Sequence, residues 1–305
     1  MDSVLELRNV RKSFGKQVVL DDINLTIHQG DIYGLIGRNG AGKTTILKTI
    51  VSLIHQDKGE ILLFGRAHGE GYMKQLTRTG SVIETPVANN ELTARQNLKY
   101  YCKVKGIVNR NAVDEALDFV GLSDTKNKKF KNFSLGMRQK LGLAIALLNQ
   151  PDFLILDEPI NGLDPIAIVE FRNLLIRLNQ TRQITILISS HILGELYQMV
   201  TKFGILNHGK IIKELTKEEF EIQSREFIQL DVDQPQLATT VLDRLGIHQF
   251  KVVGDHEIAI YELNVSNAQI VNELVATNVQ IETIIRKHTN LENYFKTMIE
   301  DGDES

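Results

Sequence analysis

The stretch GRNGAGKT at residues 37–44 decides the fold of this chain. It matches the pattern G-x-x-x-x-G-K-[ST] and stands between an apolar segment at 32–36 and a helical pattern at 44–53, the context that a P-loop requires. Glycines in such a loop let the backbone curl so that N–H groups face phosphate oxygens. Lys43 would bring a positive charge to the β- and γ-phosphates, and the Thr44 hydroxyl would bind Mg²⁺. The residues expected to bind nucleotide are Gly37, Arg38, Asn39, Gly40, Ala41, Gly42, Lys43, Thr44 and Thr45.

A second motif, FLILDE at residues 153–158, consists of four apolar residues followed by two carboxylates. This pattern is typical of a buried strand that ends in an acidic cluster. Asp157 is a candidate Mg²⁺ ligand, and Glu158 is a candidate general base that accepts a proton from the water attacking a γ-phosphate. Each motif alone has a structural alternative, a glycine-rich turn for the first and a solvated acidic turn for the second. Their joint presence favours a site that hydrolyses a nucleoside triphosphate.

A third motif, NFSLGMRQ at residues 132–139, is similar to the signature sequence of the ATP-binding cassette (ABC) ATPases. The family usually has a second glycine after Gly136, whereas this chain has Met137. Ser134 opens a predicted helix, so the N-terminus of that helix can point at phosphate. The resemblance implies that Ser134, Gly136 and Met137 bind ATP held by the P-loop of an opposite subunit, and hence a head-to-tail dimer with ATP and Mg²⁺ at the joint. A capped helix without this role is the alternative.

Three further segments follow the order of motifs in the same family. NGLDP at residues 161–165 resembles the D-loop, in which Asp164 also caps the next helix. SSH at 189–191 resembles the switch segment, which implies that His191 bonds the γ-phosphate and positions the catalytic base. Phe14 stands where the family has an aromatic residue that stacks on adenine. A structural histidine and a core phenylalanine are the alternatives for the last two residues.

Position 84 departs from the family pattern. Where the family has a glutamine that touches Mg²⁺ and the attacking water, this chain has Glu84. A carboxylate still binds Mg²⁺, but it only accepts hydrogen bonds and it adds negative charge near phosphate. We therefore expect Glu84 to be a metal or water ligand with altered coupling to the membrane partner. Glutamate here, a helix predicted at 93–107 and a small C-terminal domain resemble the branch of bacitracin and lantibiotic immunity exporters, whose ATPase and permease are separate chains.

The rest of the sequence predicts an α/β protein with a second, smaller domain. Short β-rich pieces at 5–27 indicate an antiparallel β subdomain, and strands alternate with helices after the acidic motif, as in a parallel α/β core. Helical periodicity predicts a helical subdomain at about 93–148. Together these parts form the expected nucleotide-binding domain, residues 1–222. Residues 223–305 show the β-α-β-β-α-β order of a ferredoxin-like α+β domain with an accessory or regulatory role, followed by a final helix at 289–298.

Composition and charge exclude several classes of protein. The chain has 305 residues, of which 42% are hydrophobic and 24% charged, unlike disordered, collagen-like or disulfide-rich chains. A formal net charge of −3 provides no broad cationic surface, so we expect no nucleic-acid partner. The single cysteine, the start without a signal pattern and the lack of an apolar run of about 18 residues predict a cytoplasmic protein. Work at a membrane would then need a separate permease, with this chain on the inner face of the plasma membrane.

These observations predict the ATPase subunit of an exporter. Two copies would close on ATP, drive a separate permease and part after hydrolysis. The branch resemblance points to antimicrobial peptides as the cargo, with lipids, drugs or other small molecules, and import in place of export, as alternatives. A soluble ABC ATPase acting on ribosomes or DNA is disfavoured because the chain has neither a second cassette nor a long coiled coil. A regulatory module without transport is disfavoured by the intact order of the catalytic motifs.

Overall fold

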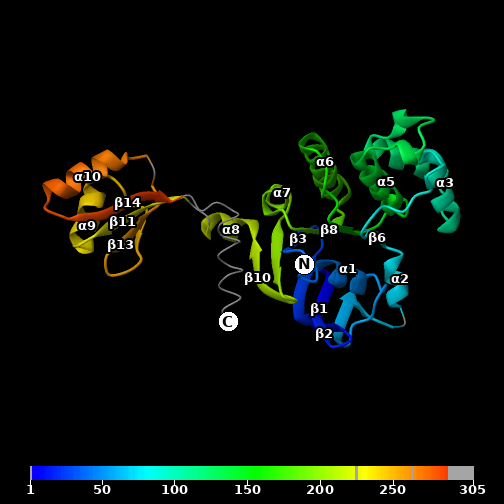
Figure 1. Cartoon of the computed structure of the whole chain (residues 1–305), viewed down its shortest axis with the longest axis horizontal. Helices are drawn as coiled ribbons and strands as arrows, with labels where there is room; N and C mark the ends of the chain where they lie inside the picture. The colour runs from blue at the N-terminus through cyan, green and yellow to red at the C-terminus, as the bar shows by residue number, and fades with distance from the viewer. Residues whose placement is uncertain (1, 70, 224–225, 263, 288–305) are drawn as a thin grey trace. The chain divides into compact units, whose positions relative to one another are not determined.

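The computed structural model describes residues 2–287 except 70, 224, 225 and 263. The chain divides into two compact units, with the boundary between Lys217 and Glu218. The domain boundary expected from the sequence lies a few residues further on, after residue 222, and that assignment stays a prediction. In the described part of the chain, none of the helices combines the length and the hydropathy needed to cross a bilayer. Figure 1 shows the elements of both units.

An antiparallel sheet opens the first unit. Its strands are β1 (Ser3–Phe14), β2 (Gln17–His28), β4 (Lys58–Leu63) and β5 (Arg66–Ala67), in the order β2-β1-β4-β5. β1 and β2 form a long hairpin, and apolar side chains from both strands enter a core that they share with helix α1 (Lys43–Ile50). The sheet confirms the antiparallel subdomain that the sequence predicts at 5–27.

A six-stranded sheet forms the centre of the first unit. Its strands are β3 (Ile32–Gly37), β6 (Thr79–Val82), β7 (Phe153–Asp157), β8 (Thr185–Ser190), β9 (Lys202–Asn207) and β10 (Lys210–Thr216), in the order β10-β9-β3-β8-β7-β6. Only β10, at one edge, runs antiparallel to its neighbour. β3, β7 and β8 are buried along their whole length, which explains their nearly continuous apolar sequences.

The predicted motifs lie together at the carboxyl ends of the parallel strands, here called the carboxyl edge of the sheet. Because β3, β7 and β8 are parallel neighbours, the P-loop after β3, the acidic pair after β7 and the SSH segment after β8 meet at one edge. Ligands of open α/β sheets bind at this edge. Connections between the strands include α1 and the helices α2 (Tyr72–Leu76), α6 (Pro165–Arg182) and α7 (Leu193–Tyr197).

A helical subdomain separates β6 from β7. It consists of α3 (Ala94–Val104), α4 (Ala112–Val120), two short 3₁₀ turns at Ser123–Thr125 and Phe130–Asn132, and α5 (Leu135–Leu147). Thr93 and Gln96 form a capping box at the start of α3, where the sequence predicts a helix to begin. α5 packs against α3, α4 and the edge strand β6, so these helices lie together beyond that end of the sheet (Figure 1).

The second unit is a small α+β domain. After α8 (Lys217–Gln223) it contains β11 (Phe227–Val232), α9 (Pro235–Arg244), β12 (Phe250–Val252), β13 (Glu257–Ile260), α10 (Asn267–Ala276) and β14 (Ile281–Lys287). Its antiparallel sheet has the order β12-β13-β11-β14, which is the ferredoxin-like arrangement expected from the sequence. Apolar side chains from one face of this sheet pack with α9 and α10 in a core of their own. The final helix predicted at 289–298 lies outside the described residues.

Candidate nucleotide-binding and catalytic site

The backbone of the P-loop requires glycine at two positions. Gly40 has a φ of 83° and Gly42 a φ of 112°, values that residues with a Cβ rarely adopt. A Cβ at Gly42 would also lie 2.8 Å from Leu20 Cδ2 and 3.1 Å from the carbonyl oxygen of Val19. No side chain caps α1, which begins at Lys43, so the first N–H groups of this helix are available to an anion.

Lys43 places a buried cation beneath this loop. Its side chain is 6% exposed, and Nζ donates to the carbonyl oxygens of Gly37 at 2.7 Å and Arg38 at 3.2 Å. Nζ also lies 3.1 Å from Glu158 Oε1. Three acceptors therefore satisfy a charge that would be costly to bury alone. The P-loop thus holds its lysine in one position and connects it directly to the candidate base.

Asp157, Thr44 and Ser189 form a hydrogen-bonded group at the ends of β7 and β8. Thr44 Oγ1 donates to Asp157 Oδ2 at 2.9 Å, and Ser189 Oγ donates to Asp157 Oδ1 at 2.7 Å. The Glu158 N–H donates in turn to Ser189 Oγ at 2.9 Å. The parallel pairing of β7 with β8 sets Asp157 opposite Ser189 and makes these bonds possible. In the sequence Ser189 is one residue of the SSH segment, and nothing in that segment predicts its hydrogen bonds to Asp157 and Glu158.

Glu158 lies between a lysine and a histidine. Its Oε1 contacts Lys43, and its Oε2 lies 2.7 Å from His191 Nδ1. Glu158 has a φ of 47°, a left-handed conformation that is unfavourable for a residue with a Cβ by about 1–2 kcal/mol. Such strain is concentrated at functional sites, where surrounding contacts hold it in place. The structure therefore brings together Lys43, Glu158 and His191, which the sequence places far apart.

The residues at this edge fit a Mg²⁺ ion in part. Thr44 and Asp157 present adjacent oxygen atoms, and Mg²⁺ in nucleotide sites usually takes one or two protein ligands, with phosphates and water completing its octahedron. Glu84, the third expected ligand, instead pairs with Lys48 at 2.5 Å. Among the described residues, no group of three or more His, Cys, Asp or Glu side chains has a metal-binding arrangement. Thr44 and Asp157 would therefore hold an ion only together with ligands from outside the chain.

A hollow at the P-loop collects most of the predicted phosphate-binding residues. Val19 and Asn161 also line it and were not among the predicted binding residues; Val19 belongs to β2, and Asn161 is the first residue of the NGLDP motif. Phe14, at the end of β1, is 51% exposed and does not line the hollow, so its role against adenine stays a prediction. The lining residues are Val19, Asn39, Gly40, Gly42, Lys43, Thr44, Thr45, Glu158 and Asn161.

The signature and D-loop residues lie together at the start of two helices. Ser134 caps α5 by accepting from the Met137 N–H at 3.3 Å, and Asp164 caps α6 by accepting from the Ala167 N–H at 2.9 Å. A Cβ at Gly136 would lie 3.3 Å from Ala167 Cβ, so the two helix starts are in close contact. Ser134, Gly136, Met137 and Asp164 do not line the hollow at the P-loop of the same chain, whereas Asn161, at the start of the NGLDP motif, does.

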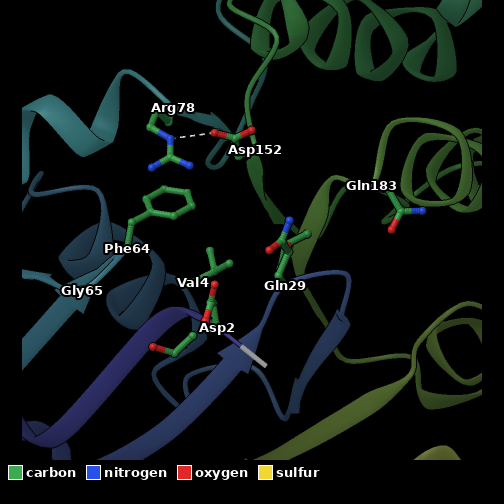
Figure 2. Close-up of a pocket in the computed structure, with 10 residues that line it drawn as sticks. Asp2, Val4, Gln29, Phe64, Gly65, Arg78, Asp152 and Gln183 are labelled. Atoms are coloured by element: carbon green, nitrogen blue, oxygen red, sulfur yellow. Dashed lines mark hydrogen bonds and ion pairs between the residues drawn. The ribbon is translucent and has the colours of Figure 1, made fainter.

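A second hollow lies at the amino edge of the six-stranded sheet (Figure 2). Arg78 precedes β6, Asp152 precedes β7 and Thr185 begins β8, so all three stand at the opposite edge from the P-loop. Arg78 Nε donates to Asp152 Oδ2 at 2.6 Å, and its guanidinium lies over the Phe64 ring, 4.0 Å from the centroid. No motif in the sequence indicated this hollow.

The fold and the group around Lys43, Asp157 and Glu158 define a P-loop nucleoside triphosphatase. A family model described as "ABC transporter" matches residues 20–161. The bacitracin transport ATP-binding protein BcrA of Enterococcus faecalis is 38% identical over 302 residues, 99% of this chain and 98% of BcrA. The chain therefore belongs to the ABC transporter family, as an ATP-binding and ATP-hydrolysing subunit.

Two further comparisons support this assignment. The lantibiotic transport ATP-binding protein SrtF of Streptococcus pyogenes is 42% identical over 211 residues, 69% of this chain and 90% of SrtF. A solved structure described as the ATP-binding subunit of an ABC transporter aligns with a TM-score of 0.63 and 31% identity over 72% of this chain and 92% of that chain. The resemblance inferred from the signature motif is thereby confirmed.

Proposed function

We propose that this chain powers the export of antimicrobial peptides through a separate membrane permease. The observation that carries the proposal is the cluster in which Lys43 and His191 hold the two carboxylate oxygens of Glu158 next to the Thr44–Asp157 pair. The cluster supports ATP hydrolysis. The cargo rests on similarity to BcrA and SrtF, which are described as bacitracin and lantibiotic transport ATP-binding proteins.

The first step is an exchange of partners at Lys43. Phosphate oxygens are strong anionic acceptors, so the β- and γ-phosphates of ATP are expected to take Nζ from Glu158 Oε1. A Mg²⁺ ion bound at Thr44 and Asp157 would neutralise charge on the phosphates. The exchange frees Glu158 Oε1 to accept a proton from the attacking water, while His191 keeps Oε2 in place. ATP binding would thus prepare its own base.

Two copies of the chain would complete the site. The N-terminus of α5, with Ser134, Gly136 and Met137, carries the partial positive charge of a helix dipole and is proposed to bind the ATP on the P-loop of the second copy. Asp164, which caps the helix start that lies against α5, would lie at this joint. Phe14 is proposed to stack on adenine. The chain would then work as a homodimer on the inner face of the plasma membrane.

A growth assay tests the cargo. A host lacking this chain receives wild type, Glu158→Gln or the control Glu170→Gln, each with the native permease, and is challenged with bacitracin and a panel of lantibiotics. Glu170 pairs with Lys140 on the surface, so its substitution changes a carboxylate outside the site. Protection by wild type and Glu170→Gln, lost with Glu158→Gln, supports the proposal. No protection by any of the three, with the ATPase activity of wild type and Glu170→Gln intact, contradicts peptide export and favours lipids or drugs as cargo.

A further inference from the structure

Lys48 and Glu84 form an ion pair that no motif predicts. Lys48 Nζ lies 2.5 Å from Glu84 Oε1, and the two side chains are 31% and 62% exposed. Lys48 follows Thr44 by four residues on α1, so both side chains lie on the same face of the helix, one turn apart. At one end of this face Thr44 bonds Asp157, and one turn further on Lys48 bonds Glu84.

The backbone after β6 supports a defined position for Glu84. Its φ of 62° is in the left-handed region, which is unfavourable for a residue with a Cβ and therefore needs support from neighbouring contacts. The next residues are anchored to the helical subdomain. Pro86 packs so closely on α5 that a Cβ at Gly142 would lie 2.8 Å from it, and Tyr101 Oη donates to the carbonyl oxygen of Val87 at 2.7 Å. The ion pair thus connects a loop anchored on these helices to the helix that follows the P-loop.

The charges at the site explain why a glutamate needs a lysine here. A triphosphate would bring several negative charges next to Asp157 and Glu158, and an unpaired third carboxylate would increase the repulsion. A neutral glutamine would need no counter-ion. Lys48 neutralises Glu84 at a position outside the lining of the P-loop hollow.

We propose that Lys48 is a positioning residue that holds Glu84 away from the metal-nucleotide site, and that Glu84 leaves Lys48 when it binds Mg²⁺ or a water on the ion. This inference rests on the proposed nucleotide site and adds a regulating ion pair to it. The ion pair and the metal compete for one carboxylate. Weakening the pair therefore raises the apparent affinity for Mg²⁺ in nucleotide binding, by linkage.

The test measures binding of a fluorescent ATP analogue to the full chain as Mg²⁺ is titrated. The proteins are wild type, Lys48→Met, Glu84→Gln and the double variant. Lys48→Met is expected to lower the Mg²⁺ concentration at half-maximal binding by about 2- to 5-fold, the range that an exposed ion pair allows. In the Glu84→Gln background the same substitution is expected to leave that concentration unchanged, because the partner of Lys48 is already gone.

Three controls accompany the titration. Binding in EDTA measures the effect of losing one positive charge near the phosphates, separately from the metal. Lys48→Arg retains a cation for Glu84 and is expected to keep the wild-type midpoint. Lys140→Met removes a lysine from another surface ion pair, the one with Glu170, and is also expected to keep it. Thermal unfolding checks that each variant is folded, and Lys48→Gln replaces Lys48→Met if the latter is not.

The outcomes distinguish this inference from the proposed function beneath it. If Lys48→Met shifted the Mg²⁺ midpoint equally in the wild-type and the Glu84→Gln backgrounds, Lys48 would act independently of Glu84, and the inference would be overturned. A higher midpoint in Lys48→Met than in wild type would also overturn it. If wild type bound no nucleotide, the proposed function itself would fail, and the regulating ion pair with it.

Discussion

The two edges of the six-stranded sheet carry similar ion pairs in different surroundings. At the carboxyl edge, Lys43 and Glu158 lie 3.1 Å apart with side chains 6% and 20% exposed. At the amino edge, Arg78 and Asp152 lie 2.6 Å apart with side chains 49% and 58% exposed. The shorter pair is the more exposed one, and water solvates its charges when the pair opens. A buried charge that loses its partner is far more costly. Burial, and not the length of the contact, therefore distinguishes the carboxyl edge, which carries the P-loop and is called the working edge below.

The largest effect is expected at the working edge, from substitution of Glu158, the candidate general base. Glu158→Gln keeps the shape of the side chain but removes the proton acceptor, so the rate of phosphate release should fall about 10²- to 10⁴-fold. Nucleotide should still bind, and gel filtration with ATP and Mg²⁺ should show a dimer that wild type does not accumulate. A Glu158→Gln protein with near wild-type turnover would assign the base to another residue.

A smaller effect, on the free energy of unfolding, is expected when one glycine at each edge is replaced by alanine. Gly42, in the P-loop, and Gly30, before β3, both have positive φ, but only Gly42 has neighbours where a Cβ would stand. Gly30→Ala should reduce the free energy of unfolding by about 1–2 kcal/mol, from backbone strain alone. Gly42→Ala should cost about 1–3 kcal/mol more because of its overlap with Leu20. Urea unfolding followed by circular dichroism measures both, and equal losses would contradict the packing argument.

The smallest effect is expected at the amino edge. Arg78→Met removes the guanidinium but keeps an apolar chain over Phe64, so the free energy of unfolding should change by about 0–1 kcal/mol. The ATPase rate should stay within about 2-fold of wild type, since an exposed charge across the sheet is screened by solvent and salt. A large fall in the ATPase rate would contradict this expectation and would mean that the hollow in Figure 2 affects hydrolysis at the P-loop.

Much of this fold could be predicted because its signals are local. The P-loop stands in a strand-loop-helix context that the sequence shows directly, and β7 reads as an apolar run ending in two acids. The order of elements in the second unit was also predicted correctly, since Gly246 and the capping box at Ser266 mark helix ends locally. Chain order and parallel pairing were then enough to bring Lys43, Glu158 and His191 to one edge.

What could not be predicted depends on contacts between residues distant in sequence. Nothing in the sequence indicates that Lys48 pairs with Glu84, since 36 residues separate them and each reads alone as a surface charge. Val19 lines the P-loop hollow because β2 passes α1, a matter of packing and not of pattern. The role expected of Phe14 comes from the resemblance to the family, and its exposed place at the end of β1 does not decide that role.

The hydroxyl of Ser189 connects the carboxylate of Asp157 to the backbone of Glu158. A hydroxyl has one hydrogen, and Ser189 gives it to Asp157 while its oxygen accepts from the Glu158 N–H. Hydrogen bonds in such a chain polarise one another. A change in the hydrogen bond to Asp157 therefore alters the bond from the Glu158 N–H, because both bonds share Ser189 Oγ. Substitutions at Asp157 and Glu158 should consequently be non-additive, and Ser189→Ala should bring them closer to additivity.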